Sequence, residues 1–468
     1  MHLTKRSLIS VTARLTVMPS NAHTNHSDDV AGETLTDGGL EGFNLFDPEV
    51  QQCPHAYYAE MQKESGVFET DVFGTPIYLV TRYEDVAACA MNPTTFSSRF
   101  DAGSMEGNSE YGRRSQELYD TEGGYERIGT LLTVDPPEHT RYRRLVSQAF
   151  TPKVIAQLEP TIRELTGELI NQLISSTSQG TPVDFVEAFA VPLPVAVIAK
   201  ALNVPDDRLA DFKRWSDASV AGIGTNISIE ERLAADREII QFQKYFAAQL
   251  ESRRDSPEDD LLTALLNATI DKDANEGIDS TPLEIAEMLS MIQQLLVAGN
   301  QTTTHLLGEM LLLLEEHPEE WKRLTSDPKY GSSVAEEALR LAAPTQGMFR
   351  VATEKTQIGS TTLPAGARVV LVYAAANRDP EVWNNPDEFQ PAREAQAKHL
   401  SFGKGPHYCV GAGLARLEAR IVAEELGKRL SAISVTNRSE LRYLPGFVLR
   451  GPERVEVVVN DKGGMNDG

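Results

Sequence analysis

The longest helical pattern in this chain runs from Thr281 to about Glu316. It begins with Thr281-Pro282-Leu283-Glu284, which has the form of an N-terminal capping box with proline at the first helical position. A helix of this span would be roughly 50 Å long at ~1.5 Å per residue, enough to cross a whole domain. Its apolar residues occupy most faces, so we expect the helix to be buried. These residues are Met288, Leu289, Ile292, Leu295, Leu296, Leu306, Leu307 and Met310.

Helical patterns dominate the rest of the chain, and the strand-like pieces are short and peripheral. We therefore predict a mainly α fold with a small β region, in a single domain over 42–460. Residues 100–130 are rich in Gly, Ser and charge without a clear period, and we expect a loop there. Residues 1–41 are predicted to be disordered or a mis-assigned N-terminal extension, and 461–468 a disordered tail. The predicted helices are 54–65, 83–90, 135–150, 154–173, 191–203, 207–222, 228–254, 259–269 and 331–343, and the predicted strands are 77–80, 349–352, 369–373, 443–448 and 454–459.

Composition limits the function classes. The net charge of −24 argues against nucleic acid and anionic membrane surfaces as partners. The chain has only three cysteines, which favours a reducing compartment without a disulfide framework. No run approaches the ~20 apolar residues that a spanning helix requires. We expect a soluble, cytoplasmic protein without a membrane span.

Polar residues interrupt the long apolar helix at Ala298-Gly299-Asn300-Gln301-Thr302-Thr303-Thr304. Glycine within a helix costs ~1 kcal/mol relative to alanine, and threonines compete for backbone carbonyls. One interpretation is a packing notch with back-bonded threonines. The other is a functional site at which the helix bends.

A second constellation lies near the C-terminal end, from Phe402 to Gly411. Its single cysteine, Cys409, stands just before a predicted helix start at Gly411-Ala412-Gly413, where free amides and the helix dipole favour a thiolate. A thiolate in such a loop is suited to a soft metal, iron in a haem included. A lone buried structural cysteine is the alternative.

The loop resembles the haem-binding loop of the cytochrome P450 family. Its pattern, F-G-x-G-x-H-x-C-x-G, is filled by Phe402, Gly403, Gly405, His407, Cys409 and Gly411. The polar stretch is similar to the family's A-G-x-(acid)-T-T signature, except that Gln301 stands where the family usually has Asp or Glu. The resemblance extends over roughly 42–460. It implies the cytochrome P450 fold, with haem b between the long central helix and the cysteine loop, and a monooxygenase that inserts one oxygen atom into a C–H bond.

The resemblance also implies roles for single residues. Cys409 would be the axial metal ligand. Thr302 would be the hydroxyl that steers protons, with Gln301 beside it as the second member of the catalytic pair. The Gln301 side chain is an amide, which cannot titrate as a carboxylate can. Buried anionic propionates need cations or donors, and the family supplies them from the positions of His139, Arg143, Arg350 and His407. The remaining cofactor-binding positions are Ala298, Gly299, Thr302, Phe402, Gly403, Val410, Gly411 and Ala415.

The resemblance implies two further sets of residues. Glu337 and Arg340 match a buried structural E-x-x-R pair, with Arg378 or Arg393 as its third member. The substrate pocket is largely apolar, which suits a terpenoid, steroid or aromatic molecule. The predicted pocket residues are Leu295, Ala298, Thr345, Gln346, Met348 and Phe447, together with the 100–130 loop.

No flavin or nicotinamide domain is present, so electrons from NAD(P)H are expected to arrive through a ferredoxin reductase and a ferredoxin. An acidic ferredoxin would dock on the basic residues of 139–153 and on Lys404, Arg416 and Arg420. A solvated charged helix is the simpler interpretation of these residues. Alternatives for the whole protein are a peroxide-using or non-oxygenating haem-thiolate enzyme, and a non-catalytic haem or ligand-binding protein.

Overall fold

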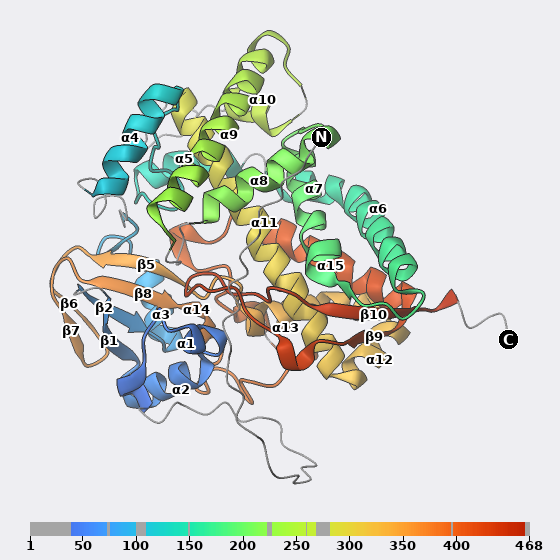
Figure 1. The fold of residues 1–468 in the computed structure, drawn as a ribbon. Coiled ribbons are helices and arrows are strands. Elements are labelled where there is room, and N and C mark those ends of the chain that lie inside the picture. The colour runs from blue at the N-terminus through green and yellow to red at the C-terminus, as the bar shows by residue number, and fades with distance from the viewer. Residues whose placement is uncertain are drawn as a thin grey trace, which may run out of the picture. The chain divides into compact units, whose positions relative to one another are not determined.

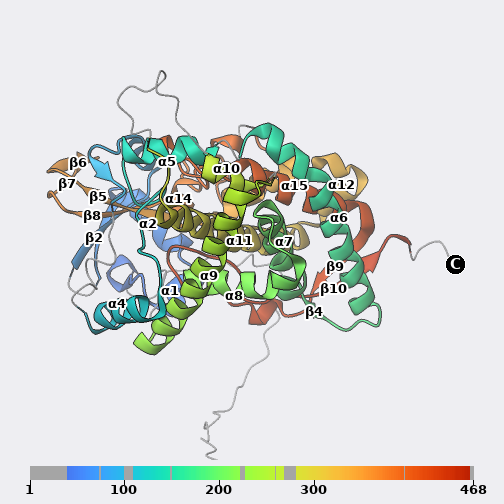
Figure 2. The same cartoon turned by 90° about the horizontal axis from the view of Figure 1, so that it is seen from above.

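Helix α11 (Ile285–Glu316) occupies the centre of the fold and is an uninterrupted α-helix of 32 residues. The computed structural model describes residues 39–72, 75–99, 109–147, 150–221, 227–258, 260–267, 281–394 and 396–463. In Figures 1 and 2, α11 lies between the sheet region and the other long helices. All eight apolar residues predicted to bury this helix are buried, including Met288, Leu296 and Met310.

The predicted start of α11 was wrong by three residues. The N-cap is Glu284, whose side chain accepts from the Glu287 amide, while the Glu287 carboxylate accepts the Glu284 N–H at 2.7 Å. The reciprocal bonds therefore form one turn later than the Thr281 pattern suggested. Leu283, immediately before the cap, is buried in the core.

Helices make up most of the described structure. They are α1 (Pro48–Gln52), α2 (His55–Glu64), α3 (Tyr83–Met91), α4 (Glu110–Glu122), α5 (Glu138–Ser147), α6 (Pro152–Thr177), α7 (Pro192–Ala201), α8 (Leu209–Val220), α9 (Ile229–Asp255), α10 (Leu261–Asn267), α12 (Pro318–Ser326), α13 (Gly331–Ala342), α14 (Tyr373–Ala376) and α15 (Ala412–Arg429). The prediction of a mainly α fold with a small β region is confirmed.

The β structure is peripheral. A five-stranded mixed sheet has the order β1-β2-β8-β5-β3, in which β2 and β8 are parallel and the other neighbours are antiparallel. A three-stranded antiparallel sheet has the order β4-β10-β9, and β6 pairs with β7. The strands are β1 (Val67–Val72), β2 (Thr75–Val80), β3 (Phe96–Ser97), β4 (Val183–Asp184), β5 (Gly347–Ala352), β6 (Thr356–Ile358), β7 (Thr361–Leu363), β8 (Arg368–Val372), β9 (Leu430–Val435) and β10 (Glu456–Asp461).

Two hydrophobic clusters share α11. Its N-terminal half packs with α7–α10, through residues such as Phe242 and Ile292. Its C-terminal half packs with α6, α13 and α15, through residues such as Met310 and Leu426. The helix is thus fixed along its length, which holds its middle, the polar stretch, in a defined position.

The region 100–130 is not one loop, because 110–122 forms α4. Ser109 caps this helix by accepting the Gly112 N–H at 3.0 Å, and Gly123 ends it at φ +67°. Its side chains are mostly polar, and Arg114 pairs with Glu230 of α9 at 2.8 Å. Only Leu118 and Tyr119 of this helix are buried, against Leu233 and Ile240 of α9, and two adjacent apolar residues give a weak helical period.

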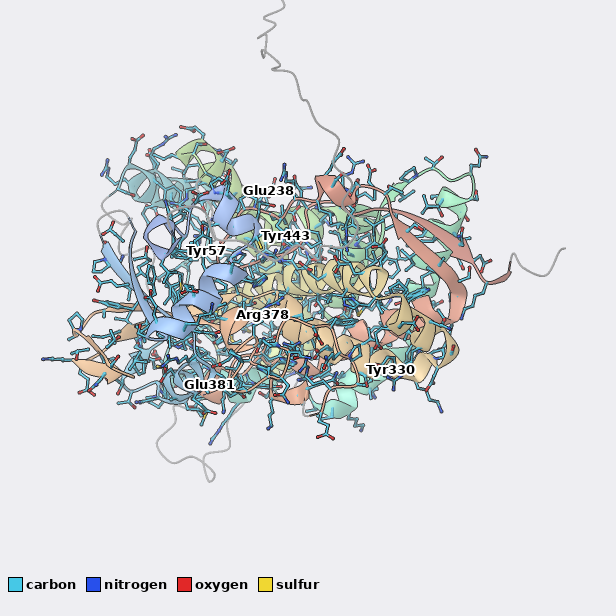
Figure 3. The ribbon with its side chains drawn as sticks, turned by 90° about the horizontal axis from the view of Figure 1, so that it is seen from below. Tyr57, Glu238, Tyr330, Arg378, Glu381 and Tyr443 are labelled. Atoms are coloured by element: carbon cyan, nitrogen blue, oxygen red, sulfur yellow. The ribbon has the colours of Figure 1, made fainter. Side chains whose placement is uncertain are left out.

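The predicted strand 443–448 was also wrong. This segment contains Pro445 and Gly446, and its one bridge in the described structure is Tyr443–Pro452; the bridge Thr345–Leu449 lies just beyond it. It is anchored instead to the N-terminal helices, since Gln52 exchanges bonds of 3.0 and 2.7 Å with the Tyr443 backbone. Figure 3 labels Tyr443 at this junction.

The expected domain over 42–460 stays a prediction. Residues 1–38 and 464–468, most of the two expected disordered ends, lie outside the described ranges. Among the residues that the structure describes, no helix is both long and apolar enough to cross a membrane.

Candidate active site

A cavity of about 310 Å³ lies between the middle of α11 and the cysteine loop. Its walls come from α5, α7, α11, the start of α15, β5, and the segments 131–132 and 448–449. Most of the lining is apolar, and the polar groups are few. Cys409 forms part of the lining opposite Ala298 and Gly299 of α11.

The cysteine loop is built by its backbone. The Cys409 N–H donates to the Phe402 carbonyl at 2.8 Å, which closes the loop, and Gly403 and Gly405 have φ of +68° and +74°. A Cβ on Gly405 would lie 2.6 Å from the Ala90 carbonyl oxygen, so only glycine fits there. A Cβ on Gly411 would meet only the Cys409 Sγ, at 3.9 Å, so this glycine borders open cavity.

The Cys409 thiol is half-buried at the end of this loop. Burial raises its pKa, while bonds from the Gly411 and Ala412 amides and the positive charges of Arg143 and Arg416 oppose the rise. The amides at the start of α15 therefore face the sulfur as the sequence predicted, but loss of hydration outweighs them. A metal ion bound to the sulfur would replace the proton outright.

Two histidine rings pack against each other at one edge of the cavity, tilted by 45°. The ring centroids of His139 and His407 are 4.2 Å apart. His407 is held from both sides, with Nε2 2.9 Å from the Ser98 hydroxyl and Nδ1 3.1 Å from the Leu131 carbonyl oxygen. Burial and neighbouring positive charges lower the pKa of His139 to about 4 and that of His407 to about 3, so both rings are neutral at pH 7.

Arg143 and Arg350 line the same cavity as this histidine pair. Arg143 donates to the Tyr408 carbonyl and Arg350 to the Phe349 carbonyl, the latter at 2.6 Å. Within the described part of the chain neither guanidinium forms an ion pair, although Arg350 is buried. A buried cation without a counter-charge is costly, so this edge is suited to an anionic group.

The polar stretch of α11 divides between two faces. Ala298, Gly299 and Thr302 line the cavity, and the Thr302 hydroxyl donates to the Ala298 carbonyl at 2.7 Å. Asn300 points away, where its amide donates to Ser216 of α8 at 2.7 Å. Gln301 does not line the cavity. The threonine is thus back-bonded, as in the packing interpretation, and at the cavity wall, as in the functional one.

A buried ion pair supports the cysteine loop from behind. Arg340 donates to both carboxylate oxygens of Glu337 at 2.7 and 3.0 Å, and Arg393 donates to the same carboxylate at 3.0 Å. Of the two candidates for the third member, the structure therefore selects Arg393, because Arg378 pairs with Asp387 instead. Arg340 also donates to the Asn377 carbonyl, and the Asn377 side chain accepts the Leu400 N–H at 2.6 Å, which ties the pair to the loop.

Comparisons with known proteins agree with this geometry. The family model described as "Cytochrome P450" matches residues 228–431. "Cytochrome P450 107B1" of Saccharopolyspora erythraea is 34% identical over 433 residues, covering 90% of this chain and 99% of the relative. "Vitamin D(3) 25-hydroxylase" of Pseudonocardia autotrophica is 32% identical over 432 residues, covering 92% of this chain and 99% of that relative. The solved structure of CYP109Q5 from Chondromyces apiculatus superposes with a TM-score of 0.76 at 35% sequence identity, and the match covers 89% of this chain and 98% of that structure.

The chain belongs to the cytochrome P450 family. It is accordingly a haem-dependent P450 monooxygenase. The residues around the cavity fit that cofactor: Cys409 offers a sulfur ligand, and the half-buried Arg143 and the buried Arg350 offer positive charge for its carboxylates. Among the described residues no group of three His, Cys, Asp or Glu side chains could hold a metal ion, so the metal prediction depends on Cys409 alone.

The structure brings the predicted cofactor-binding residues of this P450 to one cavity. All of them are in its lining, namely His139, Arg143, Ala298, Gly299, Thr302, Arg350, Phe402, Gly403, His407, Cys409, Val410, Gly411 and Ala415. Their individual roles stay predictions.

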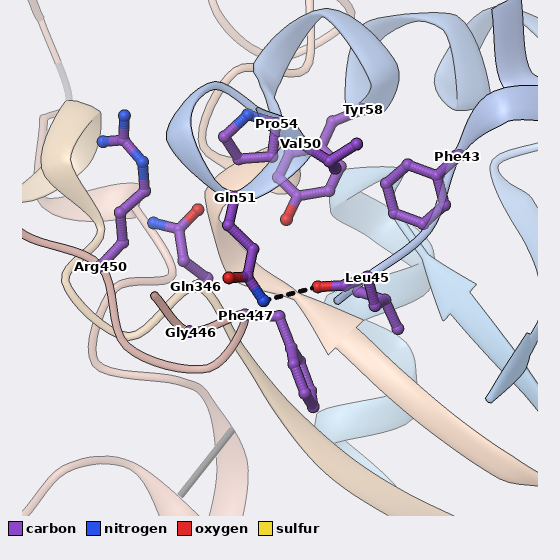
Figure 4. A pocket seen from close by; sticks show the side chains of 10 residues that line it. All are labelled: Phe43, Leu45, Val50, Gln51, Pro54, Tyr58, Gln346, Gly446, Phe447 and Arg450. Atoms are coloured by element: carbon purple, nitrogen blue, oxygen red, sulfur yellow. Dashed lines mark hydrogen bonds between the residues drawn. The ribbon is translucent and has the colours of Figure 1, made fainter. Parts of the chain in front are cut away.

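The predicted substrate residues of the P450 divide into two sets. Leu295, Ala298, Thr345 and Met348 line the main cavity. Gln346 and Phe447 do not; they line a separate pocket of about 10 Å³ with Tyr58 and Arg450 (Figure 4). Gln346 is held in that pocket by its amide, which donates to the carbonyl oxygens of Ala342 at 3.2 Å and Ala343 at 2.8 Å. We leave Gln346 and Phe447 out of the proposed substrate site.

Several cavity residues were not predicted from sequence. Gln294 stands one helical turn before Ala298, and that spacing was a usable signal. Glu418 of α15 is buried and lines the cavity, and one of its oxygens, Oε2, lacks a hydrogen-bond partner in the described structure. Leu131, Leu132 and Ser98 reach the site through tertiary contacts that no local pattern reveals.

Proposed function

We propose that this P450 oxygenates a lipophilic small molecule of the terpenoid, steroid or aromatic class, with electrons from NAD(P)H delivered by a ferredoxin reductase and a ferredoxin. The observation that carries the proposal is the apolar cavity of about 310 Å³ with Cys409 in its wall. In the reaction, one atom of dioxygen enters a C–H bond and the other leaves as water, with two electrons and two protons consumed.

The cavity lining supports the substrate class. Leu131, Leu295, Val297, Met348 and Leu449 give apolar surface to which a hydrocarbon skeleton binds without loss of hydrogen bonds. The relative named as a vitamin D(3) hydroxylase, as its name states, acts on a lipophilic molecule of this kind. Haem with a thiolate ligand supplies the oxygen chemistry, because the sulfur pushes electron density toward O–O cleavage.

Thr302 is the residue proposed to move protons. Its Oγ1 is at the cavity wall and donates to the Ala298 carbonyl at 2.7 Å, so the oxygen keeps lone pairs for a water or substrate molecule. Gln301 lies outside the lining and cannot titrate. We assign it a structural role in α11, and we assign proton delivery to Thr302 with ordered water.

A basic surface beside the cysteine loop supports docking of an acidic ferredoxin. It is smaller than the sequence suggested, because Arg141 pairs with Glu287, Arg416 with Glu336, and Arg420 with Glu159 and Glu424. The exposed cations are Arg144, Lys153 and Lys404. Arg144 and Thr151 line a groove that also reaches Pro406 of the loop and Arg143 at the cavity edge. Tyr408 and Val154 add exposed apolar surface, 39% and 37% accessible, to the same segments.

The deciding experiment is spectroscopic and then catalytic. The reduced protein with carbon monoxide is expected to give the difference band that names the family, and Cys409→Ser to abolish it while the far-ultraviolet circular dichroism is kept. A screen for compounds that convert the ferric iron to high spin then identifies ligands. Product formed with ferredoxin, reductase and NADH, and not with hydrogen peroxide alone, supports the proposed electron route. Turnover only with peroxide would replace it by the peroxide-using alternative, and tight ligand binding without any turnover would favour a haem-containing binding protein.

A further inference from the structure

One side-chain amide, that of Gln294, faces the largely apolar cavity from α11. Among the described lining residues it is the only asparagine or glutamine. Its neighbour Gln293 faces the other way and donates to Ser219 of α8 at 3.1 Å. Gln294 therefore presents polar atoms to a space whose nearby wall, at Leu131, Leu295 and Val297, is apolar.

The orientation of the Gln294 amide is set by the segment above it. We call residues 125–132 the strap; it has no regular secondary structure beyond a turn at its end. Its backbone is fastened to the helices by side chains. The Tyr125 N–H donates to Gln243 of α9 at 2.9 Å, the Ile128 N–H to Ser290 of α11 at 3.1 Å, and the Leu132 N–H to Oε1 of Gln294 at 3.3 Å.

The last of these bonds has a chemical consequence. A backbone N–H is a donor, so the atom of Gln294 that faces it must be the carbonyl oxygen, and the amide cannot flip without placing donor against donor. The Nε2 group is then left as a donor with a fixed direction. No acceptor for it is recorded among the described residues, and Gln294 is half-buried, so water can reach it when the cavity holds no substrate. A molecule that displaces this water must supply an acceptor or leave the donor without a partner.

We propose that Gln294 is a specificity-determining residue that donates a hydrogen bond to an oxygen acceptor on the substrate. The substrate class is then a lipophilic molecule that carries a carbonyl or comparable oxygen, rather than a bare hydrocarbon. This inference rests on the proposed function. The hydroxyl of Thr345 also lines the cavity, but it rotates freely and either donates or accepts, so it does not impose this selection.

The test compares two probes of equal shape, 2-adamantanone and 2-methyleneadamantane, which differ only in a carbonyl oxygen. Their dissociation constants are measured from the ferric spin-state shift in the holoenzyme. The wild type is expected to favour the ketone, and Gln294→Leu and Gln294→Glu to lower that preference about tenfold, the value of one neutral hydrogen bond. Glutamate keeps an acceptor for the Leu132 N–H and so preserves the strap while the donor is lost. Gln293→Leu is the matched control and is expected to leave the preference unchanged.

The outcomes separate this inference from the proposed function. If the wild type lacks the carbon monoxide difference band, both fall together. If the band is normal and the preference for the ketone is absent from the wild type, or unchanged in Gln294→Glu, this inference alone is overturned. A loss of preference in Thr345→Val with none in the Gln294 variants would also overturn it. A second readout is the infrared carbonyl stretch of bound 2-adamantanone, which is expected to lie at lower frequency in the wild type than in Gln294→Leu.

Discussion

Glu337 and Arg340 form an ion pair 2.7 Å long at a place where neither side chain is exposed to solvent. The remaining N–H groups of Arg340 donate to the carbonyl oxygens of Asn377, Pro386 and Glu388. The pair thus holds the segments that lead into the cysteine loop against one turn of α13.

Breaking this pair is expected to destabilise the fold strongly. Glu337→Gln leaves Arg340 buried without a counter-charge, which costs ~3–5 kcal/mol. Arg340→Met leaves Glu337 with Arg393 alone and removes the bonds to three backbone carbonyls, so a loss of the same order is expected. Urea unfolding of both variants measures this loss. The control is Lys213→Met, which breaks a pair with Asp217 in which both side chains are 48% exposed and is expected to cost less than ~1 kcal/mol. A loss at Arg340 no larger than that at Lys213 would contradict the structural role.

Glu418 is expected to make stability depend on pH. Burial raises its pKa to about 8, and no charged partner offsets the burial. A carboxyl whose folded pKa lies above its unfolded value stabilises the fold at low pH, and that contribution is lost as the pH rises from about 4.5 through about 8. The free energy of unfolding of the wild type should therefore fall by a few kcal/mol over this window relative to Glu418→Gln, since each pKa unit is ~1.4 kcal/mol.

A carboxyl on the same helix offers a control of opposite sign. Although burial opposes it, hydrogen bonds from Lys428 and Arg429 lower the pKa of Glu425. Its stabilising contribution is lost only as the pH falls below the ordinary pKa of a glutamate. Glu425→Gln should therefore leave the slope of the unfolding free energy against pH unchanged between pH 5 and 8. If the unfolding free energies of the wild type and Glu418→Gln change with pH in parallel, Glu418 is not protonated in the folded protein.

Thr302 and Gln301 are expected to differ in their effect on coupling. Thr302→Ala removes the hydroxyl at the cavity wall, and the product formed per reduced nicotinamide consumed should fall by about tenfold or more, as for a lost proton-transfer group. Gln301→Glu should leave that ratio within about twofold, because the side chain lies outside the cavity lining. Unchanged coupling in Thr302→Ala would remove Thr302 from the mechanism.

The exposed cations beside the cysteine loop should govern ferredoxin reduction kinetics. Arg144→Glu and Lys404→Glu are expected to lower the association rate by about tenfold at low salt, and the difference should shrink at high ionic strength as the charges are screened. Lys63→Glu, on α2 and with its side chain 72% exposed, is the matched control for charge alone. Rates that are insensitive to salt in the wild type would count against electrostatic docking.

The parts of the fold that the sequence predicted are those with local signals. The helix α11 was predicted because its apolar residues recur on most faces, and the cysteine loop because glycines at Gly403 and Gly405 are required by the backbone. The third member of the Glu337–Arg340 pair could not be chosen from the sequence, since no local pattern distinguishes Arg378 from Arg393 and only the tertiary packing does.

The errors have local physical causes. Thr281 and Glu284 both begin plausible capping boxes, and the later one forms because Glu287 completes it and also pairs with Arg141. Helix α4 was missed because its residues are polar on most faces. Gln346 and Phe447 were predicted in the main cavity by resemblance alone; they line another pocket, in which the Gln346 amide donates to the Ala342 and Ala343 carbonyls.

The strap is attached to the helices by hydrogen bonds between its backbone and a few side chains, and not by membership of a sheet or a helix. Its own side chains also hold it, since Arg127 pairs with Asp236 of α9 at 2.6 Å and Leu131 is buried in the core. A relative's segment of equal length, grafted in place of residues 125–132, should alter which molecules enter, and the melting temperature should stay nearly constant only if Arg127 and Leu131 are retained. The segment that supplies Leu131 and Leu132 to the cavity can thus change in shape while its points of attachment to the helices stay the same.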